Sequence, residues 1–298
     1  MTEPDRPRRS GLRGFGHDGP SPWTDLDRPP LDAAVLRHDL LLPGGLWTAL
    51  DVVEETGSTN SDLTARARDG AAEGAVLIAE RQNAGRGRLD RRWSAPARSG
   101  LFLSLLLRPT VPRERLGWLP ILVGVSAAAT LHRVAGVEVG LKWPNDLQVE
   151  HAGEERKIGG ILTELTGEAV VAGLGLNVSL REEELPVPTA TSLALVGAEV
   201  TDRTTLLRAL LREFAELYGE WQGAAGDPQT SGLLAAYTRR CTTLGRQVVV
   251  QLPGERELRG EAVALDADGR LVVRGVDGAR QSVGAGDVVH LRPQPRTG

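Results

Sequence analysis

The stretch that decides the fold is residues 139–178, VGLKWPNDLQVEHAGEERKIGGILTELTGEAVVAGLGLNV. Short apolar segments alternate in it with turn residues, a pattern that predicts β-strands. These strands are predicted at 139–143, 146–150, 157–165 and 169–178. The polar turn 151–155 should join the second and third segments as a hairpin.

The chain before this stretch mixes strands with helices. Strands are predicted at 50–54, 76–80 and 101–107, and the segment 116–134 has helical spacing with many small residues, as expected of a helix packed deep against a sheet. Ser58 or Thr59 is expected to cap a helix that ends at Gly70. Further helices are predicted at 31–42, 201–221 and 233–240. The mixture indicates an α+β fold.

The pattern of predicted elements changes after Cys241. Short strands are predicted at 247–252, 259–266, 270–274, 280–282 and 288–291, and Asp-Gly pairs supply turns between them. This pattern is typical of a small β-barrel or sandwich. We therefore expect a disordered tail at 1–30, which is rich in Pro, Gly and Arg, a catalytic domain at 31–240 and a β domain at 241–298.

Composition excludes several classes of protein. The net charge of -4 gives no global attraction to nucleic acid or to an anionic membrane. The single cysteine, Cys241, permits no disulfide framework and fits a reducing compartment. The longest apolar run, Trp118–Leu131, is broken by Pro120 and is too short to span a membrane. No signal peptide is visible, so a cytoplasmic protein is expected.

The loop 82–93, QNAGRGRLDRRW, has the chemistry of an anion cradle. Glycines expose backbone N–H groups, and the guanidinium groups of Arg86, Arg88 and Arg91 give forked donors for phosphate oxygens. It is not a Walker loop, and it lacks the third glycine of a dinucleotide fingerprint because position 90 is Asp. A solvated basic loop is the alternative.

Four other motifs could carry chemistry, and each also has a plain structural interpretation. They are GSTN at 57–60, LKWPND at 141–146, RKIGGIL at 156–162 and GLGLN at 173–177. The first motif could be no more than a helix cap, and the second no more than a turn. Lys157 in the third could be a lysine at a hairpin edge. Glycines within a strand indicate close approach by a ligand or by another backbone.

The combination and order of these five motifs resemble the biotin–protein ligase family, over residues 47–291. The resemblance implies a catalytic domain like that of class II aminoacyl-tRNA synthetases, with a mixed sheet and flanking helices, followed by an SH3-like β-barrel. It implies that biotin and ATP give biotinyl-5′-AMP and pyrophosphate. The biotinyl group then passes to one lysine of a biotin carboxyl carrier domain of an acyl-CoA or pyruvate carboxylase.

The resemblance also implies roles for individual residues. Lys157 and Arg88 would be catalytic, and Asp146 is a candidate base and a candidate Mg²⁺ ligand. The residues expected to hold biotin are Ser58, Thr59, Asn60, Gln82, Gly85, Arg86, Gly87, Arg88, Lys157, Gly160, Gly173 and Gly175. Those expected to bind ATP are Arg88, Arg91, Trp93, Lys142, Asn145 and Asn177.

Two features depart from the family pattern. Asp90 stands where the family loop usually has glycine, so it could pair with Arg88 and Arg91 and loosen their grip on the adenylate. The N-terminal region is too short and irregular for the winged helix by which some members repress an operon, so no operator binding is expected.

Three competing interpretations remain. A lipoate or octanoate ligase or transferase shares the architecture, although the GRGR loop and KWPND favour biotin. A non-enzymatic nucleotide- or RNA-binding protein would use the basic loop, but the C-terminal domain shows no aromatic stacking platform. A carrier-binding scaffold without catalysis would not need Lys157 and Arg88.

Overall fold

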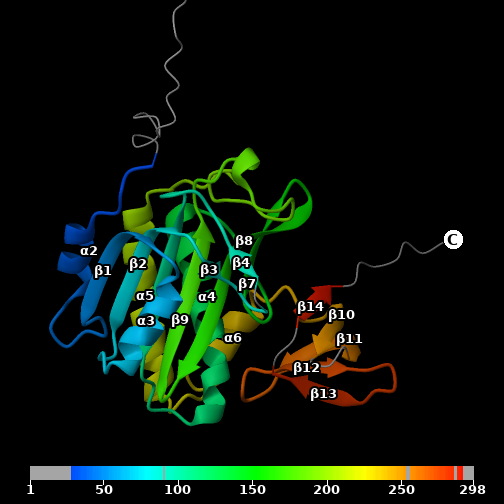
Figure 1. Cartoon of the computed structure of the whole chain (residues 1–298). Coiled ribbons are helices and arrows are strands. Elements are labelled where there is room, and N and C mark those ends of the chain that lie inside the picture. Colours follow the sequence, from blue (N-terminus) through cyan, green and yellow to red (C-terminus); the bar gives the residue numbers. More distant parts are fainter. Residues whose placement is uncertain (1–27, 90, 253–255, 285–286, 291–298) are drawn as a thin grey trace, which may run out of the picture.

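The computed structural model describes residues 28–89, 91–252, 256–284 and 287–290. Asp90 and residues 1–27 of the predicted tail therefore lie outside the described residues. A larger domain is built on one sheet with helices on both faces, and a smaller all-β domain follows it (Figure 1).

The larger domain contains nine strands and five α-helices within the described residues. Its strands are β1 Ala49–Thr56, β2 Ala75–Gln82, β3 Gly85–Arg86, β4 Arg92–Trp93, β5 Gly100–Leu107, β6 Gly140–Lys142, β7 Asp146–His151, β8 Glu154–Thr166 and β9 Ala169–Asn177. Its α-helices are α2 Ala33–Leu40, α3 Thr59–Arg68, α4 Leu119–Ala135, α5 Arg203–Gly223 and α6 Leu233–Thr238. Short 3₁₀ helices lie at Arg113–Trp118 and Glu182–Glu184.

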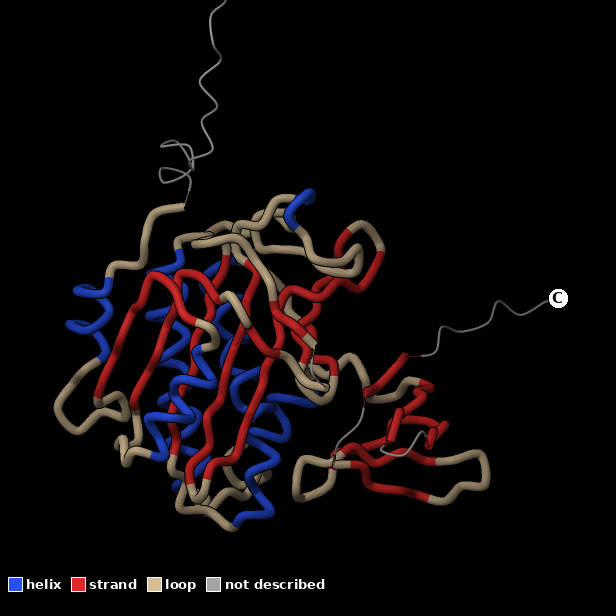
Figure 2. The backbone as a smooth tube through the Cα atoms, in the orientation of Figure 1, coloured by secondary structure: helices blue, strands red, loops and turns tan. Residues whose placement is uncertain are grey.

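The main sheet has seven strands in the order β1-β2-β5-β9-β8-β7-β6. Strands β1 and β2 are parallel because α3 crosses between them, and all other neighbours are antiparallel. Figure 2 shows the strands of the sheet in red, side by side. This is the mixed sheet with flanking helices that was predicted. The short strands β3 and β4 form a separate hairpin inside the 82–93 loop.

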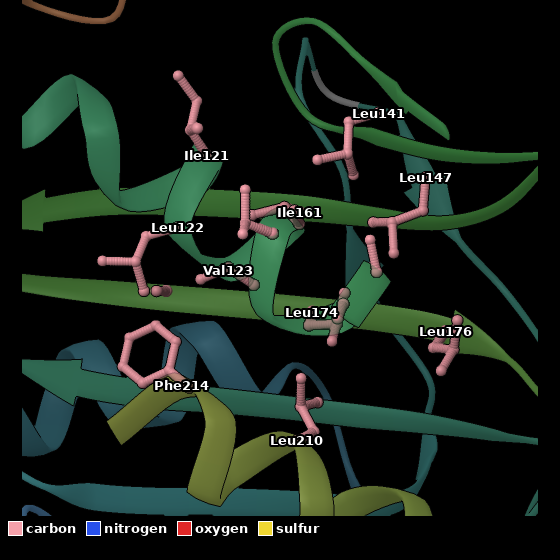
Figure 3. Close-up of a cluster of buried hydrophobic side chains, with 14 of the residues drawn as sticks. Ile121, Leu122, Val123, Leu141, Leu147, Ile161, Leu174, Leu176, Leu210 and Phe214 are labelled. Atoms are coloured by element: carbon pink, nitrogen blue, oxygen red, sulfur yellow. The ribbon is translucent and has the colours of Figure 1, made fainter. Parts of the chain in front are cut away.

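The period-2 alternation of the strands divides their side chains between two cores. Ile161 and Leu174, which are cross-strand partners, pack with Ile121 and Leu122 of α4 and with Phe214 of α5 (Figure 3). On the other face, a smaller cluster is built by residues of α3 and of the strands beneath it. Its members are Leu63, Ala67, Ala75, Leu77, Leu106, Ala169 and Val171.

Helix α4 is the apolar run of the sequence. Together with the preceding 3₁₀ turn it is long and apolar enough to cross a membrane, but most of it is buried inside the domain. Gly136, with φ +66°, ends the helix in the left-handed conformation. It is therefore the deeply packed helix that the sequence predicted.

The C-terminal domain is a five-stranded antiparallel sheet in the order β13-β12-β11-β10-β14. The strands are β10 Gln247–Leu252, β11 Arg256–Leu265, β12 Leu271–Arg274, β13 Arg280–Val283 and β14 Asp287–His290. Two tryptophan indoles of the larger domain donate hydrogen bonds to the turn between β11 and β12. The Trp118 Nε1–H donates to the Ala267 carbonyl (2.8 Å) and the Trp143 Nε1–H to the Gly269 carbonyl (3.1 Å).

The predicted tail needs one correction. Residues 28–30, which fell within the predicted disorder at 1–30, are held by the catalytic domain. The Arg28 guanidinium donates to the Ser179 carbonyl (2.8 Å) and pairs with Glu184. The Arg203 guanidinium donates to the Pro29 carbonyl (2.6 Å). Long-range contacts of this kind leave no local signal in a polar, proline-rich sequence.

Candidate active site

A cavity of about 1600 Å³ lies over one face of the sheet, between the 82–93 loop, the β7–β8 hairpin and the start of the C-terminal domain. That volume exceeds what one drug-sized ligand needs. With the exception of Gly85, every residue to which the sequence analysis gave a catalytic or binding role lines it. They are Ser58, Thr59, Asn60, Gln82, Arg86, Gly87, Arg88, Arg91, Trp93, Lys142, Asn145, Asp146, Lys157, Gly160, Gly173, Gly175 and Asn177.

The sheet register explains why separate motifs meet here. Lys142 pairs with Asp146, Asp146 with Gly160, and Gly160 with Gly175, so the four residues form one row across β6, β7, β8 and β9. Cross-strand partners project to the same face of a sheet. Three motifs that are dispersed in sequence therefore share a single strip of the cavity floor.

A β-bulge brings Lys157 to the same face. Leu147 pairs with Gly159 but Gln148 pairs with Lys157, so Ile158 is one extra residue in β8. Without the bulge, Lys157 and Gly160 would point to opposite faces, because their separation is odd. With it, the Lys157 Nζ lies 2.6 Å from Asp146 Oδ1 and 5.9 Å from the centre of the Trp93 ring.

The glycines in this row make room for an indole. A Cβ on Gly175 would lie 2.7 Å from the Trp93 ring, and one on Gly160 would lie 3.2 Å from it. The bare backbone lets Trp93 lie flat against β8 and β9. Close approach was predicted from the sequence, and its partner in this structure is Trp93 of the loop.

A cluster of cations surrounds Asp146. Arg88 donates from Nη1 to Asn145 Oδ1 (3.2 Å), and the Asn145 amide nitrogen donates to the Ile161 carbonyl (3.0 Å). Burial lowers the pKa of Arg88, and burial likewise lowers the pKa of Lys142; in both cases the Asp146 carboxylate acts in the opposite direction. A partly buried excess of positive charge is suited to a phosphate.

The opposite end of the cavity is formed by the start of α3. Thr59 and Asn60 are buried, and Gln82 Oε1 accepts from the Thr59 backbone N–H (2.9 Å). Ser58 occupies the N-cap position but its side chain makes no capping hydrogen bond. The predicted capping by Ser58 or Thr59 was therefore wrong: Gln82, from β2, satisfies this helix N–H.

Two glycines have roles other than those expected. Gly85 does not line the cavity; a Cβ there would lie 2.4 Å from the Trp93 carbonyl oxygen, so glycine is needed for the pairing of β3 with β4. Gly173 faces Asn60, whose Oδ1 would lie 2.1 Å from an added Cβ. It lines the cavity but mainly makes room for that amide.

The cavity also contains side chains that the motifs did not reveal. Arg246 and Arg259 reach it from the C-terminal domain, and Arg246 forms an ion pair with Glu155 of the β7–β8 hairpin. Their positions depend on how the two domains pack. No periodicity or local spacing in the sequence signals such a contribution.

The described residues contain no group of three or more His, Cys, Asp or Glu side chains that could hold a metal ion. Asp146 is the carboxylate at the centre of the cation cluster, and Lys157 already neutralises it. Mg²⁺ commonly binds through one or two carboxylates together with substrate phosphates. Asp146 could therefore contribute one ligand to such an ion, and bound phosphates would have to provide most of the others.

Two family models match the chain. Residues 53–180 match the Biotin/lipoate A/B protein ligase family, and residues 243–291 match the Biotin protein ligase C terminal domain. The two matches fall on the two domains seen in the structure.

Curated relatives and solved structures agree with these matches. A biotin–[acetyl-CoA-carboxylase] ligase of Mycobacterium tuberculosis is 45% identical over 90% of this chain and 100% of its own length. A bifunctional ligase/repressor of Escherichia coli K12 is 32% identical over 78% of this chain and 70% of its own length. A biotin protein ligase from Aquifex aeolicus, solved with biotin and ATP, superposes with a TM-score of 0.67 at 28% identity, over 83% of this chain and all of that one. By its sequence, its two domains and the residues that line its cavity, the chain belongs to the biotin–protein ligase family.

Proposed function

We propose that this chain uses ATP to attach biotin to a lysine of a biotin carboxyl carrier domain, through biotinyl-5′-AMP. The observation that carries the proposal is the cation cluster of Lys157, Lys142 and Arg88 around Asp146, beside a glycine floor. It is the charge pattern that joining two anions requires. The 45% identical ligase of M. tuberculosis gives independent support.

In the first step, a carboxylate oxygen of biotin attacks the α-phosphorus of ATP, and pyrophosphate leaves. Two anions approach each other, and charge builds on the phosphate oxygens in the transition state. Lys157 and Arg88 provide fixed positive charge for those oxygens without a proton transfer. Asn145 orients Arg88 through the 3.2 Å hydrogen bond.

In the second step, the amine of the carrier lysine attacks the acyl carbonyl carbon, an amide bond forms and AMP leaves. The lysine must lose a proton for its lone pair to attack. Asp146 is the candidate acceptor, because it lies on the cavity floor beside Lys157. Lys157 supplies positive charge to the developing oxyanion.

Mg²⁺ is proposed as the ion that accompanies ATP. When bound, it would screen the phosphate charge, and Asp146 would be its protein ligand. The nucleotide must provide most of the remaining ligands, because the described part of the chain offers no cluster of three acidic or histidine side chains.

The carrier domain and the cellular setting are further proposals. Acetyl-CoA carboxylase is the carrier named for the M. tuberculosis relative, and we propose an acyl-CoA or pyruvate carboxylase carrier for this chain. A negative net charge of -4 supports the proposal that the protein binds no nucleic acid. The single free cysteine supports a cytoplasmic location.

One reaction tests the function and separates it from its alternatives. The protein is incubated with MgATP, a purified carrier domain, and either biotin or lipoate, and the mass of the carrier is measured. A biotin-sized gain that disappears in Lys157→Ala is the expected result. A gain only with lipoate would assign the chain to the other branch of the matched family, and no gain with either would support a non-enzymatic role.

A further inference from the structure

Glu164 of β8 is a partly buried carboxylate that lies outside the motifs identified in the sequence. It does not line the cavity, but each of its carboxylate oxygens binds a residue that does. Oε2 accepts from the Asn60 amide nitrogen (3.0 Å), and Oε1 lies 2.9 Å from Arg86 Nη1 in the loop. Its side chain is 25% exposed, so solvent screens these contacts only in part.

Both polar atoms of the Asn60 side-chain amide are hydrogen-bonded at this position. Its amide nitrogen also donates to the Leu162 carbonyl (3.1 Å), and its Oδ1 accepts from the Ser104 hydroxyl (2.6 Å). Asn60 and Ser104 are almost fully buried, so each lost partner would leave a polar group unsatisfied. Glu164 therefore fixes which way the Asn60 amide faces.

The hydrogen bonds continue from Ser104 back to the loop. Ser104 Oγ lies 2.8 Å from Thr59 Oγ1, and the Thr59 backbone N–H donates to Gln82 Oε1 (2.9 Å). Gln82 is the first residue of the loop and Arg86 is its fifth. A polar chain beneath the cavity, made of Gln82, Thr59, Ser104, Asn60, Glu164 and Arg86, thus begins and ends on the same loop.

We propose that Glu164 is a positioning residue that couples the 82–93 loop to the buried polar floor of the proposed biotin pocket. It acts through Asn60 on the floor and through Arg86 on the loop. In this arrangement the loop stays over the cavity and delays escape of what lies beneath it. The identity of that ligand rests on the proposed function, whereas the tie between Glu164 and the loop does not.

The first test needs no ligand. Trypsin cleaves after arginine, and the loop offers Arg88, Arg91 and Arg92 beyond the paired Arg86. In Glu164→Gln, which keeps an acceptor for Asn60 but loses the charge for Arg86, we expect cleavage within 88–92 to be about threefold to tenfold faster than in wild type. Glu168→Gln, which removes an exposed carboxylate four residues further along, should cleave at the wild-type rate.

The second test measures dissociation of bound radiolabelled biotin in a chase with unlabelled biotin. Glu164→Gln should release it about threefold to tenfold faster, while kcat at saturating biotin stays near the wild-type value. In an Arg86→Ala background, Glu164→Gln should add nothing to the dissociation rate, because its partner is absent. If Glu164 had only a structural role, Glu164→Gln would change the melting temperature in both backgrounds. It would also change the biotin dissociation rate by the same factor in both, so the coupling between Glu164 and Arg86 would be zero.

The outcomes separate the two proposals. Wild-type protein that does not bind biotin would overturn the proposed function, and the trypsin comparison would still decide on Glu164. Equal loop cleavage in wild type and Glu164→Gln, or a full-size effect of Glu164→Gln in the Arg86→Ala background, would overturn the inference. If Glu164→Gln fails to fold, Arg86→Ala breaks the same pair at a half-exposed side chain and should give the same increase in cleavage.

Discussion

The ammonium nitrogen of Lys157 lies 2.6 Å from Asp146 Oδ1, although the two residues belong to different strands and reach the same face only through the bulge at Ile158. The pair sets each residue's role in the two proposed steps. Lys157 is a fixed cation in both, whereas Asp146 is needed as a proton acceptor only in the second. A substitution at Asp146 should therefore affect the steps unequally.

In Asp146→Asn, transfer from preformed biotinyl-5′-AMP to the carrier should slow by about 10²–10⁴-fold, since an amide cannot accept the proton. Adenylate formation should fall less, because the nucleotide provides most of the Mg²⁺ ligands and the amide oxygen of Asn can still contribute one. Single-turnover mass spectrometry of the carrier and pyrophosphate release measure the two steps separately. Glu154→Gln, at the mouth of the cavity, is the control. Equal slowing of both steps would remove Asp146 from the role of base.

Gly173→Ala should destabilise the protein and weaken biotin binding together. The added Cβ would lie 2.1 Å from Asn60 Oδ1, so the amide must move and its hydrogen bonds with Ser104 and Glu164 must break. Overpacking of this kind costs about 1–3 kcal/mol in unfolding free energy. Chemical denaturation and calorimetric biotin titration measure the two effects. Gly219→Ala in α5, where no atom lies within 4 Å of the added Cβ, should leave biotin binding unchanged and should not lower stability, because alanine favours a helix more than glycine does.

The affinity for ATP should fall as pH rises above neutrality, because Lys142 loses its positive charge. Burial lowers its pKa, so its ammonium loses the proton at a lower pH than a solvent-exposed lysine would. As pH rises through this lowered pKa, a positive charge near the phosphates disappears. Lys142→Arg should keep its affinity to higher pH, since arginine stays protonated. ATP titrations from pH 7 to about 10 check this, and parallel curves for the two proteins would contradict it.

The same shift has the opposite sign for folding. Between the lowered folded-state pKa of Lys142 and its ordinary unfolded-state pKa, the unfolded chain binds the additional proton. The contribution of Lys142 to unfolding free energy therefore rises with pH across this window. Weaker nucleotide binding there would not be a sign of unfolding.

Asp90, which lies outside the described residues, stands where the family loop usually has glycine. Its carboxylate can compete with the adenylate phosphate for Arg88 and Arg91. Biotinyl-5′-AMP should therefore dissociate faster from the wild-type protein than from Asp90→Gly. A chase with unlabelled adenylate gives both rates, and equal rates would show that Asp90 only shapes the turn.

Trp143→Phe should raise the KM for ATP and lower unfolding free energy by about 1–3 kcal/mol, because the Gly269 carbonyl loses its buried donor. Trp143 immediately precedes the turn that carries Asn145 and Asp146, so loosening the indole should loosen that turn. Trp47→Phe removes a matching 3.1 Å hydrogen bond, to the Leu211 carbonyl, inside the catalytic domain. It should lower stability without changing KM; the same change of KM in both variants would contradict a role for the domain junction.

The sequence predicted most of the elements because each has a local cause. Alternating or apolar runs marked the strands, Gly70 followed a helix, and Asp-Gly pairs marked hairpin turns. The predicted site residues also line the cavity, with Gly85 as the exception, because they sit in compact motifs whose order resembles a family.

What the sequence did not predict depends on contacts between distant segments. The capping of α3 by Gln82 joins β2 to a helix 23 residues earlier, and Glu164 of β8 pairs with Arg86 of the β3–β4 hairpin, 78 residues earlier. Ile158 has no composition that marks it as a bulge; only the pairing of β7 with β8 reveals it. Register and packing, rather than residue type, determine these features.

The hydrogen bonds from Trp118 and Trp143 to the turn between β11 and β12 have a consequence for building chimeras. Both indoles belong to the catalytic domain, and both acceptors are backbone carbonyls of the C-terminal one. A graft that exchanged C-terminal domains with a relative would therefore need that relative's turn to match in backbone shape, whatever its side chains. A crossover placed at Cys241 that kept this shape should give a working hybrid, whereas a turn one residue longer should leave two buried indole N–H groups without acceptors.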